Sequence, residues 1–495
     1  NTVPLFVNYV LERKHTSGAE SSGGVCVNKR KGNVKNSISV HIFLGDSLVT
    51  NDTGVEHHPQ NIPDEIGYDR IRDAFRSKSE IAYQGAVQRL DNKRTHLKQN
   101  PKPADNAAVP EFKRMPPAVW IGPSALTNPC PVTDMEQLSN RLSKVFSDYP
   151  ELFNHCVKVY QKRVDYYRLT SEGQKILQPD TAFHITARAS IKTDGNEVKT
   201  EYYRLHVGGI NDLPSEDALI GELHQFAQYM RQKSRAKAVE DLYIGPVLYE
   251  DDAAMELLAR KIADHSHSYW ISIRNQSDRK HRYLGKQVFP PALSVCQLGS
   301  DSVYNGVKLL GYRQVDADGT KPMTLPIIEK GILKHMLTGR TPSLGCPAST
   351  GNEHFDGLSR SLETRYIAGV FHVTSNRPVP YSKLYKRFLK AAKKAGLEHT
   401  YIIRKNRTSP YALIRVDLST GKEELVEGNY NAPSREQFKR MHAISKEENV
   451  YNLDPAGGKG LGIISPKAIL LEDMELDITP SRARHIDEAF YELRH

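Results

Sequence analysis

The stretch GYRQVDADGTKPMTLPIIEKGILKHMLTGR, residues 311–340, decides much of the predicted fold. It contains an Asp-Ala-Asp-Gly turn at 316–319, an apolar run, and a second turn at Lys330-Gly331. Asp and Gly are turn residues, and an apolar run between two turns is typical of a β-hairpin. The stretch therefore predicts a well-formed hairpin that carries no evident catalytic group.

Alternating runs of the same kind occur in two other parts of the chain. The first 50 residues contain PLFVNYVLER, GGVCVNKR and SISVHIFLGD. Residues 156–211 contain three more runs, with turns at Glu172-Gly173 and Asp194-Gly195. This pattern predicts antiparallel strands that bury one face of each sheet.

Segments with helical spacing lie between these runs. We expect one long or broken helix over 64–98, a helix at TDMEQLSNRLSKVF with a capping box from Thr133 to Glu136, and a helix within 215–241. The eight prolines between 101 and 131 predict an extended connection.

Strands and a few helices mix along the chain without a regular βαβ rhythm. The predicted class is therefore α+β, with antiparallel or mixed sheets and flanking helices. A boundary near residue 240 would give an N-terminal α+β domain, 1–240, and a β-rich domain, 241–495.

The composition is that of a globular protein. Of the 495 residues, 39% are apolar and 25% are charged, and the net charge of +10 comes from interspersed basic and acidic groups. No run approaches the roughly 20 apolar residues of a membrane span, so we expect a soluble protein. The chain starts at Asn1 rather than Met. We interpret this start as processing or trimming, which leaves open whether the protein is cytoplasmic or exported.

Positive charge is most concentrated in YSKLYKRFLKAAKKAGLEH, residues 381–399. The apolar residues that fall close to one helical stripe are Leu384, Phe388, Ala391, Ala395 and Leu397, and Gly396 is placed to end the helix. This spacing favours an amphipathic surface helix over a phosphate-binding one. Because charge is dispersed elsewhere, we do not expect nucleic acid to be a partner.

The cysteines define no recognisable framework. The five positions are Cys26, Cys130, Cys156, Cys296 and Cys346. None has a CxxC spacing, so the sequence predicts no zinc ribbon. One disulfide could form, and spacing alone does not select it.

Five segments together resemble the TldD/PmbA family, also called modulators of DNA gyrase and regarded as metallopeptidase-related. They are GPVLYEDDAAMELL (245–258), LGKQVFPPALSV (284–295), GYRQVDADGTKP (311–322), LPIIEKGILKHMLTGR (325–340) and SPKAILLEDMEL (465–476). The N-terminal segments are similar to those of a bacterial branch with a long N-terminal domain, in which further residues precede the position of Asn1. The resemblance implies a two-domain TldD/PmbA-like architecture, with the hairpin as scaffold and the 315–320 turn beside a central cavity.

The resemblance also implies where zinc chemistry would lie. Peptidase members carry an HExxxH motif, with two His ligands and a Glu base, and a Cys ligand near the C-terminus. At the matching positions this chain has Ala259, Arg260 and Asp264, and the segment DPAGGKGLG (454–462) lacks a Cys. The resemblance thus implies no catalytic residue and no cofactor.

Other residues could form a zinc site in place of the missing motif. His265 and His267 lie one residue off the expected position, and His354 falls where the family carries a polar loop near its cavity. These three are alternative ligands for zinc. The candidate substrate contacts are Glu353, Asp356, Tyr312 and Asp316.

Three functions follow from this resemblance. The favoured one is a non-catalytic PmbA/TldE-like subunit that forms the wall of a peptide-binding proteolytic cavity. Its ligand would be unfolded peptide, docked by strand addition, and its partner a TldD-like paralogue or a second copy. The alternatives are an active metallopeptidase with an altered metal site, and a gyrase- or nucleic-acid-associated regulator.

Overall fold

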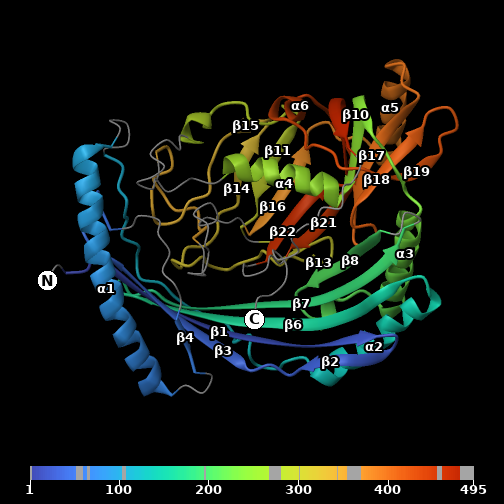
Figure 1. Ribbon diagram of the computed structural model, residues 1–495. Helices are drawn as coiled ribbons and strands as arrows, with labels where there is room; N and C mark the ends of the chain where they lie inside the picture. The colour runs from blue at the N-terminus through green and yellow to red at the C-terminus, as the bar shows by residue number, and fades with distance from the viewer. Residues whose placement is uncertain are drawn as a thin grey trace.

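The computed structural model describes residues 3–51, 60–63, 67–102, 108–193, 197–266, 280–299, 301–342, 344–353, 369–453 and 460–479. Within these ranges the chain forms sheets of eight, seven and six strands and one two-stranded sheet (Figure 1). Most pairings are antiparallel, and the helices are few. The predicted α+β class is therefore confirmed.

The eight-stranded sheet is formed by the N-terminal part of the chain. Its order is β4-β3-β1-β6-β7-β5, with β2 paired to β1 and β8 paired to β7. The strands are β1 (Phe6–Ser22), β2 (Val25–Arg30), β3 (Val34–Phe43), β4 (Gln60–Ile62), β5 (Val119–Ile121), β6 (Phe153–Thr170), β7 (Lys175–Lys192) and β8 (Val198–Val207). The predicted turn between β6 and β7 is confirmed, with Gly173 at φ 89°.

Helices cover both ends of this sheet (Figure 1). Helix α1 (Tyr68–Gln99) is continuous and packs on β3 through a small cluster that includes Ala86 and Leu90. At the other end lie α2 (Val132–Ser143), η1 (Lys144–Asp148) and α3 (Glu216–Ser234).

The capping box predicted for α2 was wrong. The helix begins at Val132 with Pro131 in the N-cap position, and no side chain caps it. Thr133 is already inside the helix, so its hydroxyl donates to Asp134 Oδ1 at 3.3 Å instead.

The C-terminal part forms the other sheets. The seven-stranded sheet runs β20-β23-β10-β17-β18-β19-β9, and the six-stranded sheet runs β15-β14-β11-β16-β22-β21. Their strands are β9 (Lys237–Ala238), β10 (Asp241–Asp251), β11 (Leu293–Gln297), β14 (Leu325–Glu329), β15 (Ile332–Leu333), β16 (Val370–Ser375), β17 (His399–Lys405), β18 (Ala412–Asp417), β19 (Glu423–Glu427), β20 (Met441–Ile444), β21 (Glu448–Leu453), β22 (Leu461–Pro466) and β23 (Ala468–Ile478). The two-stranded sheet joins β12 (Val303–Tyr304) and β13 (Val307–Lys308), and the helical segments are η2 (Ile210–Asp212), α4 (Asp252–Ser266), η3 (Lys280–Tyr283), α5 (Tyr381–Lys394) and α6 (Arg435–Lys439).

The hairpin predicted from residues 325–340 is confirmed, although β15 is only two residues long. Lys330 and Gly331 both have positive φ, 47° and 81°. Two positive-φ residues in a two-residue loop define a type I′ turn, whose twist matches that of the flanking strands.

Helix α4 lies between the two C-terminal sheets (Figure 1). Its Ala254, Leu258 and Ile262 share a buried cluster with Val247 of the seven-stranded sheet and Val295 of the six-stranded sheet. Burial of these apolar faces against one another holds the two sheets together.

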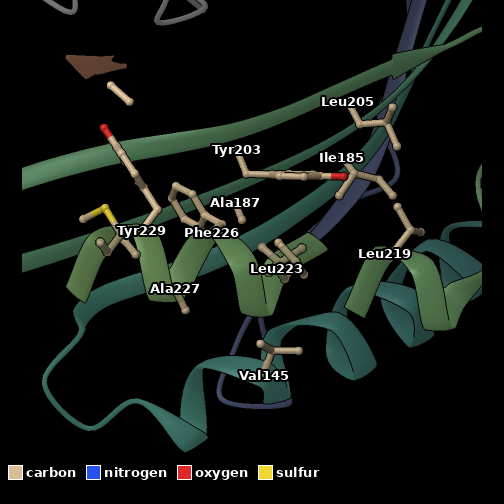
Figure 2. Close-up of a cluster of buried hydrophobic side chains, with 14 of the residues drawn as sticks. Val145, Ile185, Ala187, Tyr203, Leu205, Leu219, Leu223, Phe226, Ala227 and Tyr229 are labelled. Carbon is tan, nitrogen blue, oxygen red and sulfur yellow. The ribbon is translucent and has the colours of Figure 1, made fainter. Parts of the chain in front are cut away.

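A second buried cluster joins the N-terminal and C-terminal parts of the molecule. Figure 2 shows Leu223 and Phe226 of α3 packed on Ile185 and Tyr203 of the large sheet. The same cluster includes Phe388 of α5. The two parts therefore share a core, and the domain boundary near residue 240 stays a prediction.

Other expectations have mixed outcomes. In α5, Leu384 and Phe388 are buried as predicted, but Ala392 is the third buried residue, and Ala395 is exposed. No two cysteines in the described ranges are joined by a disulfide. Among the described helices, none is long and apolar enough to cross a membrane.

Candidate functional site

The turn at 316–319 is organised by the Asp316 side chain. Its Oδ1 accepts the backbone N–H groups of Asp318 and Thr320, both at 2.9 Å, and its Oδ2 accepts that of Glu353 at 3.0 Å. Asp316 is fully buried. It therefore fixes the turn and ties it to the segment ending at Glu353.

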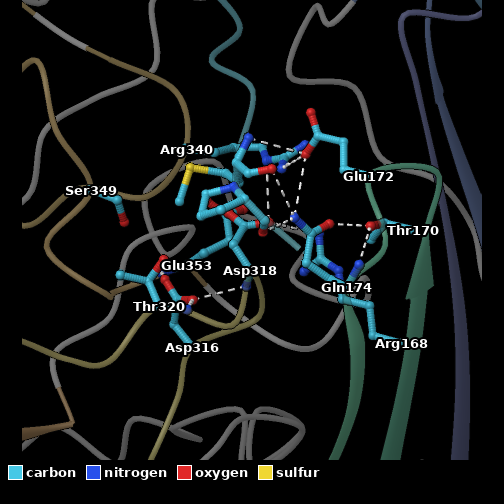
Figure 3. Close-up of polar contacts among 12 residues, drawn as sticks. Arg168, Thr170, Glu172, Gln174, Asp316, Asp318, Thr320, Arg340, Ser349 and Glu353 are labelled. Atoms are coloured by element: carbon cyan, nitrogen blue, oxygen red, sulfur yellow. Dashed lines mark hydrogen bonds and ion pairs between the residues drawn. The ribbon is translucent and has the colours of Figure 1, made fainter. Parts of the chain in front are cut away.

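Beside this turn, buried charges connect the two parts of the molecule (Figure 3). Asp318 Oδ1 lies 3.3 Å from Nη2 of Arg168, at the end of β6, and 3.2 Å from Nε of Arg340. Arg340 Nη2 donates to Glu172 Oε2 at 2.6 Å. These four residues, which we call the junction network, join the β6–β7 turn to the 311–340 stretch.

Surrounding groups hold the junction network in place. The Arg340 guanidinium carbon lies 3.9 Å from the ring centre of Phe6 and 5.0 Å from that of Phe112. Gln174 donates to the Pro116 carbonyl at 2.9 Å and is hydrogen-bonded to Thr170. Stacking on the two aromatic rings orients the planar guanidinium of Arg340, while the Gln174 contacts hold the β6–β7 turn.

Several polar atoms of the junction network have no hydrogen-bond partner among the described residues. They are Arg168 Nε, Glu172 Oε1, Asp318 Oδ2 and Arg340 Nη1. Leaving a buried polar atom unpaired is costly, so native proteins usually satisfy such atoms with water or ligand. The network thus has donors and acceptors available in the interior.

Burial and the neighbouring Asp318 carboxylate raise the pKa of Asp316 to about 8. The three backbone N–H groups that it accepts act in the opposite direction. Burial also lowers the pKa of Arg168, and the neighbouring Asp318 carboxylate partly offsets this lowering. The site therefore contains a carboxyl group that can titrate near neutral pH.

The predicted substrate contacts lie in different surroundings. Glu353 is buried next to Asp316, and its carbonyl accepts the Ala317 N–H at 3.3 Å. Tyr312 is half-buried just before the turn. Asp356 lies outside the described residues. The structure thus brings Glu353 and Asp316 together, and a peptide contact by any of the four stays a prediction.

The predicted metal ligands cannot be placed in the same way. His265 belongs to α4, but its side chain lies outside the described part of the structure, as do His267 and His354 entirely. Among the described residues, no group of three or more His, Cys, Asp or Glu side chains is placed to hold a metal.

Helix α4 carries the positions at which the sequence resemblance implies a zinc motif. Ala259 is half-buried there against Met255, Tyr451 and Ile463, and Arg260 is exposed. A methyl group has no lone pair, and an arginine stays protonated, so neither can bind zinc or accept a proton from water. These two residues do not fit the zinc site that the resemblance implies.

The start of α4 carries a feature that sequence reasoning missed. Asp251 adopts φ 54°, and its carboxylate accepts from Asn449 at 3.0 Å and Asn406 at 3.3 Å. Burial raises the pKa of the next residue, Asp252, to about 7, with Lys405 opposing the shift. The sequence signal for this feature was the pair of adjacent aspartates, Asp251 and Asp252, between an apolar strand and an amphipathic helix.

Comparison with known proteins agrees with this architecture. Residues 244–372 match the model of the PmbA/TldA metallopeptidase C-terminal domain. A candidate modulator of a DNA gyrase from Thermotoga maritima has a TM-score of 0.59 at 14% identity, over 95% of this chain and 96% of that one. A comparison with curated proteins finds no match.

Two further solved structures share the fold. TldE from Thermococcus kodakarensis has a TM-score of 0.57 at 10% identity, over 95% of this chain and 96% of that one. A candidate modulator of DNA gyrase from Bacteroides thetaiotaomicron has a TM-score of 0.60 at 12% identity, over 96% and 95%. The fold and the matched segment define a metallopeptidase-related protein. Its matched segment, residues 244–372, and its fold are those of the TldD/PmbA family.

Proposed function

We propose that this chain is a non-catalytic, PmbA/TldE-like subunit of a peptidase assembly. In this role it forms part of the wall of a cavity that holds unfolded peptide. The zinc chemistry belongs to a TldD-like paralogue, and a second copy of the chain is the alternative partner.

The observation that carries this proposal is the composition of α4. At the positions where family peptidases have their first His and their Glu, this helix has the packed Ala259 and the exposed Arg260. A zinc hydrolase needs protein ligands for the metal and a base for the bound water. Neither residue supplies these functions.

The edge of the large sheet supports a peptide-binding role. Strand β5 pairs with β7 on one side, and no described strand pairs with its other edge. Val119 and Ile121 are 70% and 64% exposed there. An added Cβ at Gly319 would lie 2.6 Å from Ala118, so the edge is next to the 316–319 turn. An extended peptide can extend such an edge through main-chain hydrogen bonds.

The test combines metal analysis with reconstitution. Purified tag-free chain is offered zinc, dialysed and analysed for metal, and hydrolysis of an unfolded protein is then measured with and without a zinc-bearing TldD-type partner. We expect no stoichiometric zinc, no activity alone, and altered activity of the partner in the mixture. About one zinc per chain, or activity alone, would overturn the proposal and direct substitution to His265, His267 and His354.

The nucleic-acid alternative is tested separately. Two of the similar structures are named as candidate modulators of DNA gyrase, and that name applies to those proteins. Phosphate contacts make DNA affinity fall steeply with salt. We expect no salt-dependent DNA binding, and a steep dependence would favour the regulator instead.

A further inference from the structure

The exposed side of α5 carries an unusual charge distribution. Its 14 residues include six basic side chains and no acidic one: Lys383, Lys386, Arg387, Lys390, Lys393 and Lys394. All six are exposed, and none forms an ion pair with another described residue. Like charges at i,i+4, such as Lys386 and Lys390, cost about 0.2–0.5 kcal/mol per pair. An acidic partner surface would relieve this repulsion.

Next to α5, part of the seven-stranded sheet is left bare by the described residues. Leu242 and Ile244 of β10 are 67% and 62% exposed. Tyr243 and Val247 belong to the buried cluster on the opposite face of the sheet, so alternation places Leu242 and Ile244 on the α5 side. Farther along β10 on the same face, Leu248 shares a buried cluster with Leu384 and Phe388 of α5. The bare strip therefore lies on the face of β10 that α5 covers, nearer the start of the strand.

Acidic side chains flank the same strip. On β23, Glu475 is opposite Ile244 and Asp477 is opposite Leu242. Their neighbour Leu476 is buried in the cluster on the other face, so both carboxylates point to the α5 side. Both are exposed, and neither forms an ion pair within the described residues.

We propose that this face binds a second copy of the chain through a two-fold axis. The basic end of α5 in one copy, Lys393 and Lys394, lies over Leu242 and Ile244 of the other and pairs with its acidic side chains. In a two-fold interface each surface meets itself, so a basic ridge beside an acidic strip is self-complementary.

The dimensions and side-chain chemistry fit this arrangement. A helix is about 10 Å thick, so α5 forms a ridge beside a strip of sheet that lies lower by about its own thickness. The aliphatic stems of lysines can cover apolar residues while their ammonium groups reach carboxylates. The inference rests on the proposed role as a subunit, and it identifies the surface used for pairing with a copy.

Charge reversal provides the test. Sedimentation velocity is measured at low and high salt for the wild-type full chain and for two variants, Lys393→Glu/Lys394→Glu and Glu475→Lys/Asp477→Lys. We expect a wild-type dimer that salt weakens, and a dimer dissociation constant raised by about tenfold or more in each variant. Circular dichroism confirms that each variant is folded.

Mixing the two variants gives the decisive result. In a mixed dimer, one contact pairs the reversed, acidic helix with the reversed, basic strip. The other contact pairs the unreversed helix with the unreversed acidic strip, so opposite charges meet at both contacts and the dimer should return. The matched control is Lys31→Glu/Lys35→Glu, which changes two exposed lysines, one in the β2–β3 connection and one on β3. It should dimerise as the wild type does.

Three outcomes would overturn the inference. The first is a monomer at all concentrations, and the second is a dimer that neither reversal weakens. The third is loss of the dimer without recovery in the mixture, since a two-fold contact requires that recovery. None of these outcomes affects the proposed role of the chain beside a zinc-bearing partner, which the metal and activity measurements test.

Discussion

Asp316 holds a proton that the unfolded chain releases. Its pKa of about 8 in the folded protein lies above the ordinary value of about 4. Between these two values the folded state binds one more proton. The stability that this group contributes is therefore complete below about pH 4 and is lost as the pH rises through about 8.

Asp316→Asn removes this titration and tests it. We expect the stability of the wild type relative to the variant to fall by about 2 kcal/mol or more between about pH 5 and pH 9, since one pKa unit corresponds to about 1.4 kcal/mol. Urea unfolding at several pH values measures the difference. The exposed Asp473→Asn should show no such trend. A difference that stays constant with pH would mean that the three N–H donors keep Asp316 ionised.

The sequence predicted the Asp316 turn, but it could not predict the junction network. Asp-Ala-Asp-Gly is a local signal, because the Asp side chain and the glycine act within the turn itself. Arg340 and Glu172 are 168 positions apart. Their contact depends on how the β6–β7 turn meets the C-terminal part, and composition and spacing do not encode that geometry.

At the scale of elements, a comparison of two glycines distinguishes the effect of backbone strain on stability from that of steric crowding. Gly319 and Gly421 have similar φ values, 78° and 73°. An added Cβ would lie 2.6 Å from the Ala118 Cβ at Gly319 and would meet nothing within 4 Å at Gly421.

We expect Gly421→Ala to lower the free energy of unfolding by about 1 kcal/mol, through strain alone. Gly319→Ala should cost at least about 1 kcal/mol more, because β5 must also shift. Denaturant unfolding of both variants gives the comparison. Equal costs would show that β5 moves away from the turn without resistance.

Helix α4 permits a direct test of its packing. Ala259→His places an imidazole where the resemblance implies a zinc ligand, but here a small side chain packs against Tyr451. We expect a loss of about 1–3 kcal/mol in the free energy of unfolding, as for other overpacked sites. Arg260→Glu, at the adjacent exposed position, should stay within about 0.5 kcal/mol of the wild type. An unaffected Ala259→His variant would mean that this position has room for a ligand.

Periodicity in the sequence predicts the buried face of a helix better than it predicts where the helix begins or ends. In α5 the spacing of Leu384 and Phe388 predicted the buried face, because 3.6-residue periodicity survives in any amphipathic helix. The first residue of α2 was mispredicted. Thr133 followed by Glu136 suggested a cap, but the helix begins one residue earlier, at Val132, with Pro131 in the N-cap position. Helix ends depend on one or two residues and are correspondingly harder to predict.

At the scale of the molecule, the cluster shared by α3, α5 and the large sheet predicts that both parts unfold together. Phe388→Ala removes a fully buried ring from this cluster. We expect a loss of about 3–5 kcal/mol, with faster hydrogen exchange in both β7 and β17. Hydrogen exchange followed by mass spectrometry resolves the two strands.

Leu90→Ala is the matched control, because Leu90 belongs to the small cluster between α1 and β3. It should speed exchange mainly in α1. If Phe388→Ala affected β17 and left β7 unchanged, the two parts would be independent units, and residue 240 would be a true boundary.

The position of β1 in the large sheet has a consequence for synthesis of the protein. β1 lies between β3 and β6, and Asn8 pairs with Thr170. At about 5–20 residues per second, β6 leaves the ribosome on the order of ten seconds after β1. During that interval the long edge of β1 is open to other chains. Binding of a holding chaperone to the nascent chain during this interval should therefore raise the yield of folded protein, compared with synthesis without the chaperone.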